Sequence, residues 1–211
     1  MKSLFITATN TDIGKTYTTL KLIEAFSQQG ILVGVCKPIE TGVTDEPVDA
    51  KVLLEAVQKR NPNFRNLKPT DITAYTFELP AAPFCADITK SISIKTIKEK
   101  IFEMQQRCDL LIIEGAGGLM VPITANYYMI DLIEDLNTKT LLVTPSQLGC
   151  INDTLLSINA LKNRALTFDW CVNMHKEREE FKKVTEPYYN EIFQNWWEFD
   201  KGLKHFINKF F

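Results

Sequence analysis

Five short runs of apolar, often β-branched residues recur along this 211-residue chain, at 3–7, 31–37, 109–115, 139–145 and 168–174. Each run is nearly continuous rather than alternating, which is typical of parallel strands covered on both faces. Helical patterns lie between them at 16–29, 49–60, 93–107 and 152–163, with Ser93 as a predicted N-cap. The alternation predicts one domain over 1–211, an α/β fold whose parallel sheet is flanked by helices on both faces through right-handed crossovers.

Charge and cysteine usage narrow the function. The formal net charge is -2, so the chain lacks the basic excess that usually accompanies nucleic-acid binding. The five cysteines are dispersed without CxxC spacing, which favours reduced thiols over a disulfide framework or a zinc site. No apolar run approaches a membrane span, and the one at the N-terminus is too short for a signal peptide. We therefore expect a soluble cytoplasmic protein that binds neither nucleic acid nor membrane.

Two segments depart from the strand–helix pattern. The stretch 61–86 contains four prolines and little periodicity, so we expect an irregular excursion near the strand ends where α/β sites form. The aromatic C-terminal stretch 196–211 places its apolar residues on one helical face. This pattern favours a helix packed on its own domain or on a partner subunit. A membrane-surface helix is the alternative, which the mixed charges of the stretch weaken.

A small polar loop, "ATNTDIGKT", joins the first apolar run to the first helix. Strand, loop and helix in this order are the context of a P-loop, whose backbone N–H groups surround phosphate. Gly14 would let the backbone approach the ligand, Lys15 would meet the β- and γ-phosphates, and the Thr16 hydroxyl could bind Mg²⁺. The common GxxxxGK[ST] pattern would need glycine where Thr9 stands, so an accidental match is the alternative.

Three later segments support a nucleotide site. "CKPIETG" places Lys37 at the end of a predicted strand, where ligands bind in open α/β sheets. "IIEGAGG" places Glu114 beside small residues that leave room for a substrate, and "LGCINDTLL" leads into a helix whose N-terminal amides could bind an anion. Each segment has a structural alternative. "CKPIETG" could be a solvated strand end, "IIEGAGG" a simple turn, and "LGCINDTLL" a plain loop–helix junction. The two histidines, His175 and His205, lie in no motif and are expected to serve the surface or packing.

In these segments the chain resembles the dethiobiotin synthetases, over about residues 3–173. That family has a P-loop one residue longer than usual, GTxTxxGKT, which "ATNTDIGKT" matches with Ala8 in place of the first glycine and Asn10 in place of the usual aspartate. "KPIETG", "EGAGGLMVP" and "LGCINDTLL" match its other motifs. "LPAAPF" lacks the family's serine, and the purine-pocket segment G-x-I-P is not recognisable after Asn173, so the choice between ATP and GTP stays open.

The resemblance implies roles for individual positions, with Lys37, Lys15 and Thr11 as the catalytic residues. It implies nucleotide contacts at Asp12, Ile13, Gly14, Lys15, Thr16 and Tyr17, with Asn173 at the purine. It implies Mg²⁺ ligands at Thr16, Asp49 and Glu114. It implies substrate contacts at Thr11, Asp12, Lys37, Thr41, Gly117, Gly149, Cys150, Ile151 and Asn152. It also implies a homodimer in which a tyrosine, Tyr188 or Tyr189, reaches the partner's site.

The implied reaction uses 7,8-diaminopelargonic acid, CO₂ and ATP, with Mg²⁺. An amine captures CO₂, the carbamate is phosphorylated, and the second amine closes the ureido ring. Two other readings remain. A partitioning-type P-loop ATPase shares the order of elements but carries an early lysine in its P-loop, where this chain has Asn10, Thr11 and Asp12. The second is a nucleotide-binding module without catalysis. The sequence argues against it because the chain retains Lys15, Thr16, Lys37 and Glu114.

Overall fold

The computed structural model describes residues 2–210. The strands are β1 (Lys2–Ala8), β2 (Val33–Cys36), β3 (Ile39–Thr41), β4 (Tyr75–Phe77), β5 (Leu110–Gly118), β6 (Pro122–Thr124), β7 (Tyr127–Tyr128), β8 (Lys139–Pro145) and β9 (Phe168–Asn173). The α-helices are α1 (Lys15–Gln28), α2 (Val48–Gln58), α3 (Pro83–Ala86), α4 (Ile94–Gln105), α5 (Met129–Leu136), α6 (Cys150–Asn163), α7 (Arg178–Glu180), α8 (Glu186–Ile192) and α9 (Phe199–Phe210). Short 3₁₀ turns cover Pro62–Phe64 and Pro69–Ile72, and a π-helical turn covers Phe181–Thr185.

The five predicted strands form one parallel sheet in the order β2-β5-β1-β8-β9. Their continuous apolar character reflects burial on both faces of the sheet, as expected. In β1, for example, the consecutive residues Leu4, Phe5 and Ile6 are all fully buried. The pairing register sets the ends of the strands at a common level. Ile6 lies opposite Glu114, and Cys36 lies opposite Ile113. Lys37, the residue after β2, is therefore brought beside Glu114.

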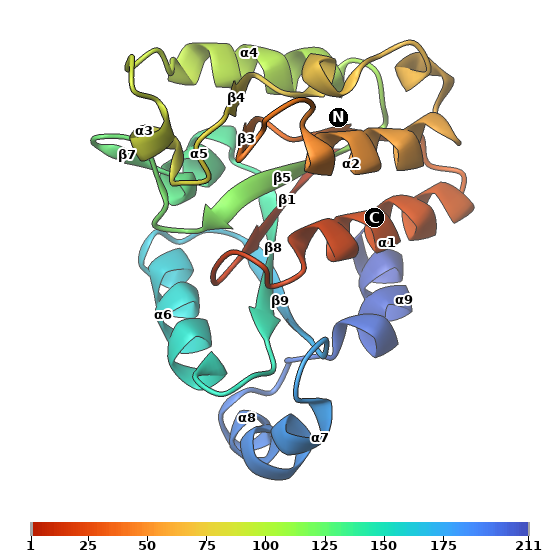
Figure 1. Cartoon of the computed structure of the whole chain (residues 1–211). Coiled ribbons are helices and arrows are strands. Elements are labelled where there is room, and N and C mark those ends of the chain that lie inside the picture. The colour runs from red at the N-terminus through yellow and green to blue at the C-terminus, as the bar shows by residue number, and fades with distance from the viewer. Residues whose placement is uncertain (1, 211) are drawn as a thin grey trace.

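Helices cover both faces of the sheet, as the strand–helix alternation predicts (Figure 1). On one face α1 packs on β1, β2 and β5, with α2 against it and α9 on β9. On the other face α4, α5 and α6 pack on β2, β5 and β8. The predicted helix boundaries are close to the observed ones: α1 is followed by Gly30, whose φ of 82° suits a stop, and the Ser93 hydroxyl caps α4 by accepting from the Thr96 N–H.

The stretch 61–86 is more regular than expected. It contains two 3₁₀ turns, the short helix α3 and the strand β4, which pairs in parallel with β3. Helix α5 was not predicted. It is only eight residues long, too short for its apolar spacing to be distinguished from a strand, and it begins where the Asp131 carboxylate caps the Tyr128 N–H.

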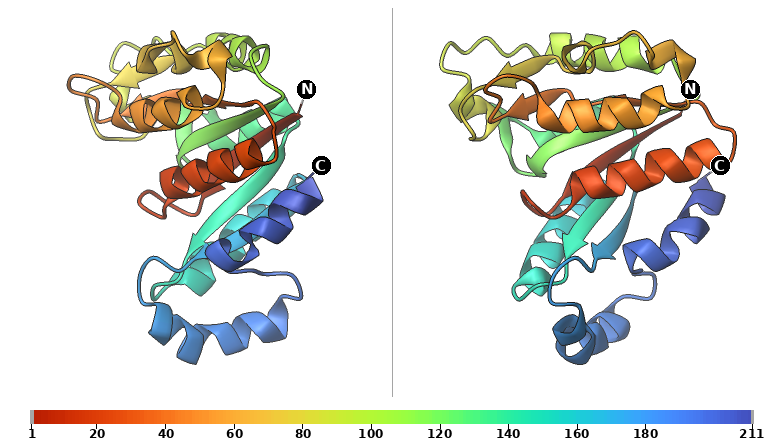
Figure 2. Two further views of the ribbon diagram at one scale, coloured as in Figure 1. Left: turned by 90° about the vertical axis from the view of Figure 1, so that its right-hand side faces the viewer. Right: turned by 45° about the vertical axis from the view of Figure 1, so that its right-hand side comes forward.

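The C-terminal helix α9 packs on its own chain. Figure 2 shows α9 beside α1, and the rings of Phe26 and Phe210 meet edge to face at 5.3 Å. Phe199, Phe206 and Ile207 are buried, so the apolar face of α9 is occupied within the molecule. The membrane-surface reading of this helix was therefore wrong. Among the described residues, no helix combines the length and the apolar character that crossing a membrane requires.

Candidate active site

The loop after β1 has the geometry of a phosphate-binding loop. Gly14 has a φ of 99°, a left-handed conformation that glycine adopts without strain, and α1 begins at the next residue. The Lys15 side chain turns back over the loop, and its Nζ donates to the Asn10 carbonyl at 2.9 Å. The first-turn N–H groups of α1 have no partner within the helix, so they are available to an anion.

Asn173, at the end of β9, closes the loop from the opposite side. Its Nδ2 donates to the Ile13 carbonyl at 2.8 Å, and the side chain is buried. A Cβ atom on Gly14 would lie 2.1 Å from the same Nδ2, closer than any real contact. Two strand ends that are distant in sequence therefore hold the loop in one conformation.

Lys37 is the centre of a charged cluster at the carboxyl ends of β2 and β5. Its Nζ lies 2.6 Å from Glu114 Oε1 and 3.0 Å from Asp49 Oδ2. Lys37 and Glu114 are almost completely buried, whereas the Asp49 side chain is 44% exposed. A buried ammonium between two carboxylates is stable only because both partners are present.

Glu114 also binds the first helix. Thr16 Oγ1 donates to its Oε1 at 3.0 Å, and Thr19 Oγ1 donates to its Oε2 at 2.6 Å. The Glu114 carboxylate therefore joins the P-loop helix to Lys37 through direct hydrogen bonds. The contribution of Thr19, one helical turn after Lys15, could have been found from the i, i+4 spacing.

The pKa values of the two lysines are shifted in opposite directions. Burial, and then the neighbouring charge of Lys37, lower the pKa of Lys15 to about 8. Burial acts in the same direction on Lys37, but the carboxylates of Glu114 and Asp49 outweigh it and raise the pKa of Lys37 above its ordinary value. Lys37 is therefore permanently charged near neutral pH, while Lys15 would hold its proton more firmly once an anion is bound.

These groups surround one cavity of about 790 Å³. Its wall contains predicted site residues from five parts of the chain: Thr11, Asp12, Gly14, Lys15, Thr16, Tyr17, Lys37, Thr41, Asp49, Gly117 and Asn173. Ile13 lies just behind the wall with its side chain buried, and Glu114 lies beneath Lys37 and Thr16. The residues to which the family resemblance assigned nucleotide, metal and substrate contacts are thus largely adjacent in space.

The predicted residues Gly149, Cys150, Ile151 and Asn152 do not line this cavity. They form the start of α6, beside a smaller hollow of about 280 Å³ whose wall includes Thr9, Asn10, Met120, Asp153 and Leu156. Both hollows border the P-loop, since Asn10 belongs to the wall of the smaller one and Thr11 to the wall of the larger one. Within this chain, the start of α6 is therefore separate from the cavity that Lys15 and Lys37 line.

Several residues of the cavity were not predicted. Glu40 belongs to the segment "CKPIETG", between Lys37 and Thr41, and it lines the cavity. Its acidic side chain, next to two predicted site residues, could have indicated a role in the site. The cavity wall also includes Met174, His175, Lys176 and Asp200. His175 thus lines the cavity, where only a surface or packing role was expected. Asp200 comes from α9, and its Oδ1 accepts a hydrogen bond from the Tyr17 hydroxyl at 2.8 Å.

The donor set suits a divalent cation carried by a nucleotide. Within residues 2–210 no three His, Cys, Asp or Glu side chains are grouped so that they could hold a metal by themselves. However, Lys37 faces two carboxylates with a single positive charge, and the Thr16 hydroxyl bonds one of them. Mg²⁺ is usually held by one or two carboxylates together with substrate phosphates, so these residues fit it.

The parallel sheet, the loop before α1 and the buried lysine cluster define a P-loop nucleotide-binding protein. Solved structures agree on the fold: the MinC:MinD cell division protein complex of Aquifex aeolicus (TM-score 0.56, 18% identity, 99% of this chain and 86% of that chain) and a plasmid partition protein of Borrelia burgdorferi (TM-score 0.59, 9% identity, 99% and 97%). At these identities the likeness concerns the fold alone. A family model described as an AAA domain matches residues 2–183.

Sequence relatives identify the family. The chain is 57% identical to the ATP-dependent dethiobiotin synthetase BioD of Sulfurovum sp. over 206 residues, 98% of both chains. It is 37% identical to the enzyme of the same name from Wolinella succinogenes over 97% of this chain and 95% of the relative. The chain therefore belongs to the ATP-dependent dethiobiotin synthetase family, and it is a ligase that uses ATP.

Proposed function

We propose that the cavity above the P-loop is where this chain carries out the dethiobiotin synthetase reaction. The observation that carries the proposal is the convergence of Lys15 and Lys37 on one cavity, with Glu114 beneath it in contact with both Thr16 and Lys37. Lys15 and the loop amides hold the triphosphate, and Lys37 faces the carbamate and its phosphorylated form. Thr11, Asp12, Thr41 and Gly117 complete the substrate side, Ile13 and Gly14 belong to the loop, and Asn173 contacts the purine.

The chemistry needs no nucleophile from the protein. One amine of 7,8-diaminopelargonic acid attacks CO₂ and loses a proton, which gives a carbamate anion. A carbamate oxygen then takes the γ-phosphoryl group, ADP leaves, and the product is a mixed anhydride. The second amine attacks the carbonyl carbon and loses a proton, phosphate leaves, and the ureido ring closes. The task of Lys15 and Lys37 is to hold two anions side by side and to offset their charge.

We propose Mg²⁺ as the metal, held by the Thr16 hydroxyl and the carboxylates of Asp49 and Glu114. When bound with the nucleotide, Mg²⁺ neutralises phosphate charge and orients the γ-phosphoryl group. The chain itself supplies the rest of the arrangement. Thr19 holds Glu114 in place through a 2.6 Å hydrogen bond, and Lys37 keeps both carboxylates close to the loop.

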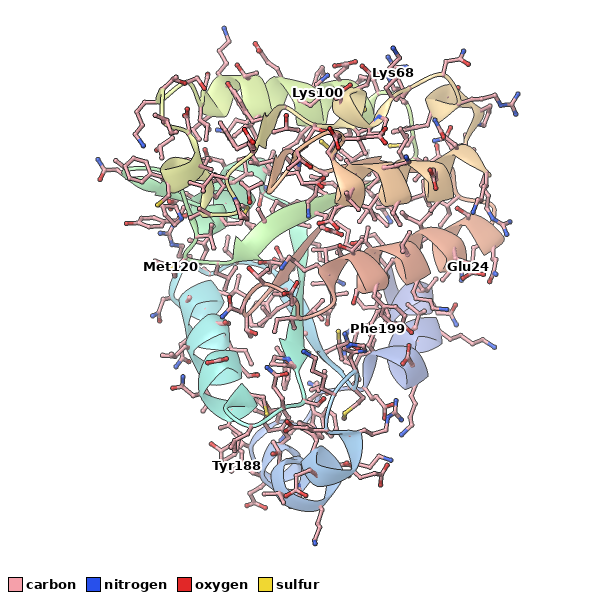
Figure 3. All side chains as sticks on the ribbon, viewed as in Figure 1. Glu24, Lys68, Lys100, Met120, Tyr188 and Phe199 are labelled. Carbon is pink, nitrogen blue, oxygen red and sulfur yellow. The ribbon has the colours of Figure 1, made fainter. Side chains whose placement is uncertain are left out.

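The start of α6 suggests a second subunit. The wall of the larger cavity does not include Gly149, Cys150, Ile151 and Asn152, so we propose that they bind the substrate carboxylate across a homodimer interface. Exposed apolar residues near α6, among them Met120, Leu148 and Leu156, support a partner there. We assign Tyr188 as the tyrosine that reaches the partner, because it is 38% exposed at the surface (Figure 3). Tyr189 is fully buried, and its hydroxyl donates to the Cys150 carbonyl and to Thr154 Oγ1.

A cytoplasmic location and a single domain over 1–211 belong to the same proposal. All five cysteines are free thiols, and four of them are buried, which suits a reducing compartment. Helix α9, at the C-terminal end, contributes Asp200 to the same cavity that the N-terminal P-loop lines. Segments near both ends of the described chain, the P-loop and α9, thus line one cavity, which supports treating the chain as a single domain.

We expect Asp200 to affect the choice of base. Asp200 lines the same cavity as Asn173, the proposed purine contact, and its carboxylate could accept two N–H groups from guanine but only one from adenine. Asp200→Asn should therefore lower kcat/KM for GTP about tenfold more than for ATP. Tyr17→Phe, which removes only the hydroxyl that bonds Asp200, is the matched control and should leave the ratio nearly unchanged. An unaltered ratio in Asp200→Asn would exclude Asp200 from base selection.

The function is tested by measuring phosphate release with ATP, diaminopelargonate and bicarbonate, each omitted in turn. We expect release to require both the diamine and the carbon source, because the phosphoryl acceptor is the carbamate that they form. Release that needs neither, and that a protein or DNA surface stimulates, would point to the partitioning-type ATPase instead. Binding of nucleotide without any release would indicate a module that lacks catalysis.

A further inference from the structure

Helix α2 begins without a local cap. The residue before it is Pro47, which provides no side-chain hydrogen bond to the helix. The first-turn N–H groups of a helix need acceptors from elsewhere, and a buried N–H group without one is costly. Asp49 and Ala50, the second and third residues of α2, are in this position.

Glu40 on β3 supplies the missing acceptors. Its Oε1 accepts from the Asp49 N–H at 2.9 Å, and its Oε2 accepts from the Ala50 N–H at 2.9 Å. The Glu40 side chain is nearly buried, and its bond to the Ala50 N–H is fully buried while its bond to the Asp49 N–H is partly buried. A carboxylate at a helix N-terminus is also favoured by the helix dipole, and hydrogen bonds to a charged acceptor are stronger than neutral ones.

The cap determines where Asp49 stands. The backbone of Asp49 is held by Glu40, while its side chain accepts from Lys37 Nζ at 3.0 Å. Lys37 in turn contacts Glu114, which bonds Thr16. Glu40 thus begins a continuous series of contacts that runs through α2 and the lysine cluster to the P-loop helix. It touches none of the phosphate-binding groups directly.

We propose that Glu40 is a positioning residue for this reaction, which acts by holding the start of α2 so that Asp49 meets Lys37 and the metal. The inference rests on the proposed role of Asp49. Loss of the cap would let the first turn of α2 shift or fray, and Asp49 would move away from Lys37. A small displacement of a positioning group can cost a large factor in rate, since the reacting groups must be closely aligned.

The test is Glu40→Gln, which preserves the size of the side chain but offers one acceptor and places an NH₂ group against a backbone N–H. We expect kcat to fall about tenfold to a hundredfold. The affinity for nucleotide without Mg²⁺ should be unchanged, and the gain in affinity that Mg²⁺ provides should shrink. In the ligand-free chain, the amide hydrogens of Asp49 and Ala50 should exchange faster. Ser93→Ala, which removes the cap of α4 at a residue that does not line the cavity, should alter neither turnover nor the effect of Mg²⁺.

A double-mutant cycle separates positioning from general stability. If Glu40 acts through Asp49, adding Glu40→Gln to Asp49→Asn should change kcat by less than about twofold. Multiplied losses in the double variant would overturn the inference, as would normal turnover in Glu40→Gln. If Asp49→Asn itself keeps full turnover, the proposed role of Asp49 fails and the inference fails with it. Should Glu40→Gln not fold, the shorter carboxylate of Glu40→Asp would be measured, with a smaller loss expected in the same quantities.

Discussion

Replacement of Lys37 by methionine should lower kcat by about 10²–10³-fold and leave the affinity for ATP within about threefold. The expected difference follows from where the ammonium lies. Lys37 Nζ is held by Glu114 and Asp49 near the ends of β2 and β5, whereas the proposed site for the triphosphate is the loop before α1. The lost charge is therefore one that counts when the carbamate accepts a phosphoryl group, rather than when the nucleotide binds.

Stability must be measured beside turnover, because Lys37→Met leaves the buried Glu114 without its cation. Removing one partner of such a pair costs about 3–5 kcal/mol, so turnover should be assayed well below the unfolding temperature of the variant. Lys51→Met is the matched control. Lys51 forms an exposed pair with Glu46 at 2.7 Å, which is worth little. If Lys37→Met weakened ATP binding as much as turnover, Lys37 would belong to the nucleotide site instead.

Replacement of Gly14 by alanine should weaken ATP binding by at least about tenfold and reduce the free energy of unfolding by about 2–3 kcal/mol. The φ of 99° at Gly14 strains any residue with a Cβ, by about 1–2 kcal/mol. The new methyl group would also displace Asn173, breaking its hydrogen bond to the Ile13 carbonyl at a cost of about 1 kcal/mol. The loop would then be free to change the direction of its amides.

Gly30→Ala separates the two causes. Gly30 also has a positive φ, 82°, but a Cβ there would meet no atom within 4 Å. It should therefore show the backbone strain without the clash and keep normal ATP affinity. In Gly14→Ala combined with Asn173→Ala, the clash is removed, so the loss of stability should be less than the sum of the single losses. Equal ATP affinity in Gly14→Ala and the unaltered chain would show that the loop tolerates a side chain here.

Much of the fold could be predicted because its causes are local. Strands buried on both faces must be apolar throughout, and the five runs that met this condition became β2, β5, β1, β8 and β9. The loop, the lysine after β2 and the acid on β5 could be predicted for the same reason, since strand ends in a parallel sheet share one edge. Helix α5 and the pair β3–β4 were missed because they are too short for periodicity to distinguish.

Contacts between distant segments could not be predicted. Asp200 meets Tyr17 across 183 positions of sequence, and Asn173 meets Ile13 across 160. No spacing rule connects such pairs, because they depend on how α9 and β9 are placed beside α1. Glu40 belongs to the segment "CKPIETG", which was recognised from the sequence. Its capping of α2 could not be predicted, because it depends on the direction that β3 takes after Lys37.

The amino-acid order by itself thus determined the five strands of the main sheet, the phosphate loop and the family, because each of these is encoded in a few consecutive residues. The tertiary structure alone decided which side chains share the cavity, that the start of α6 lies outside it, and that α9 contributes Asp200 to its wall. The physical reason is that burial and local backbone geometry act on neighbouring residues, whereas hydrogen bonds and ion pairs form wherever packing brings their atoms within reach.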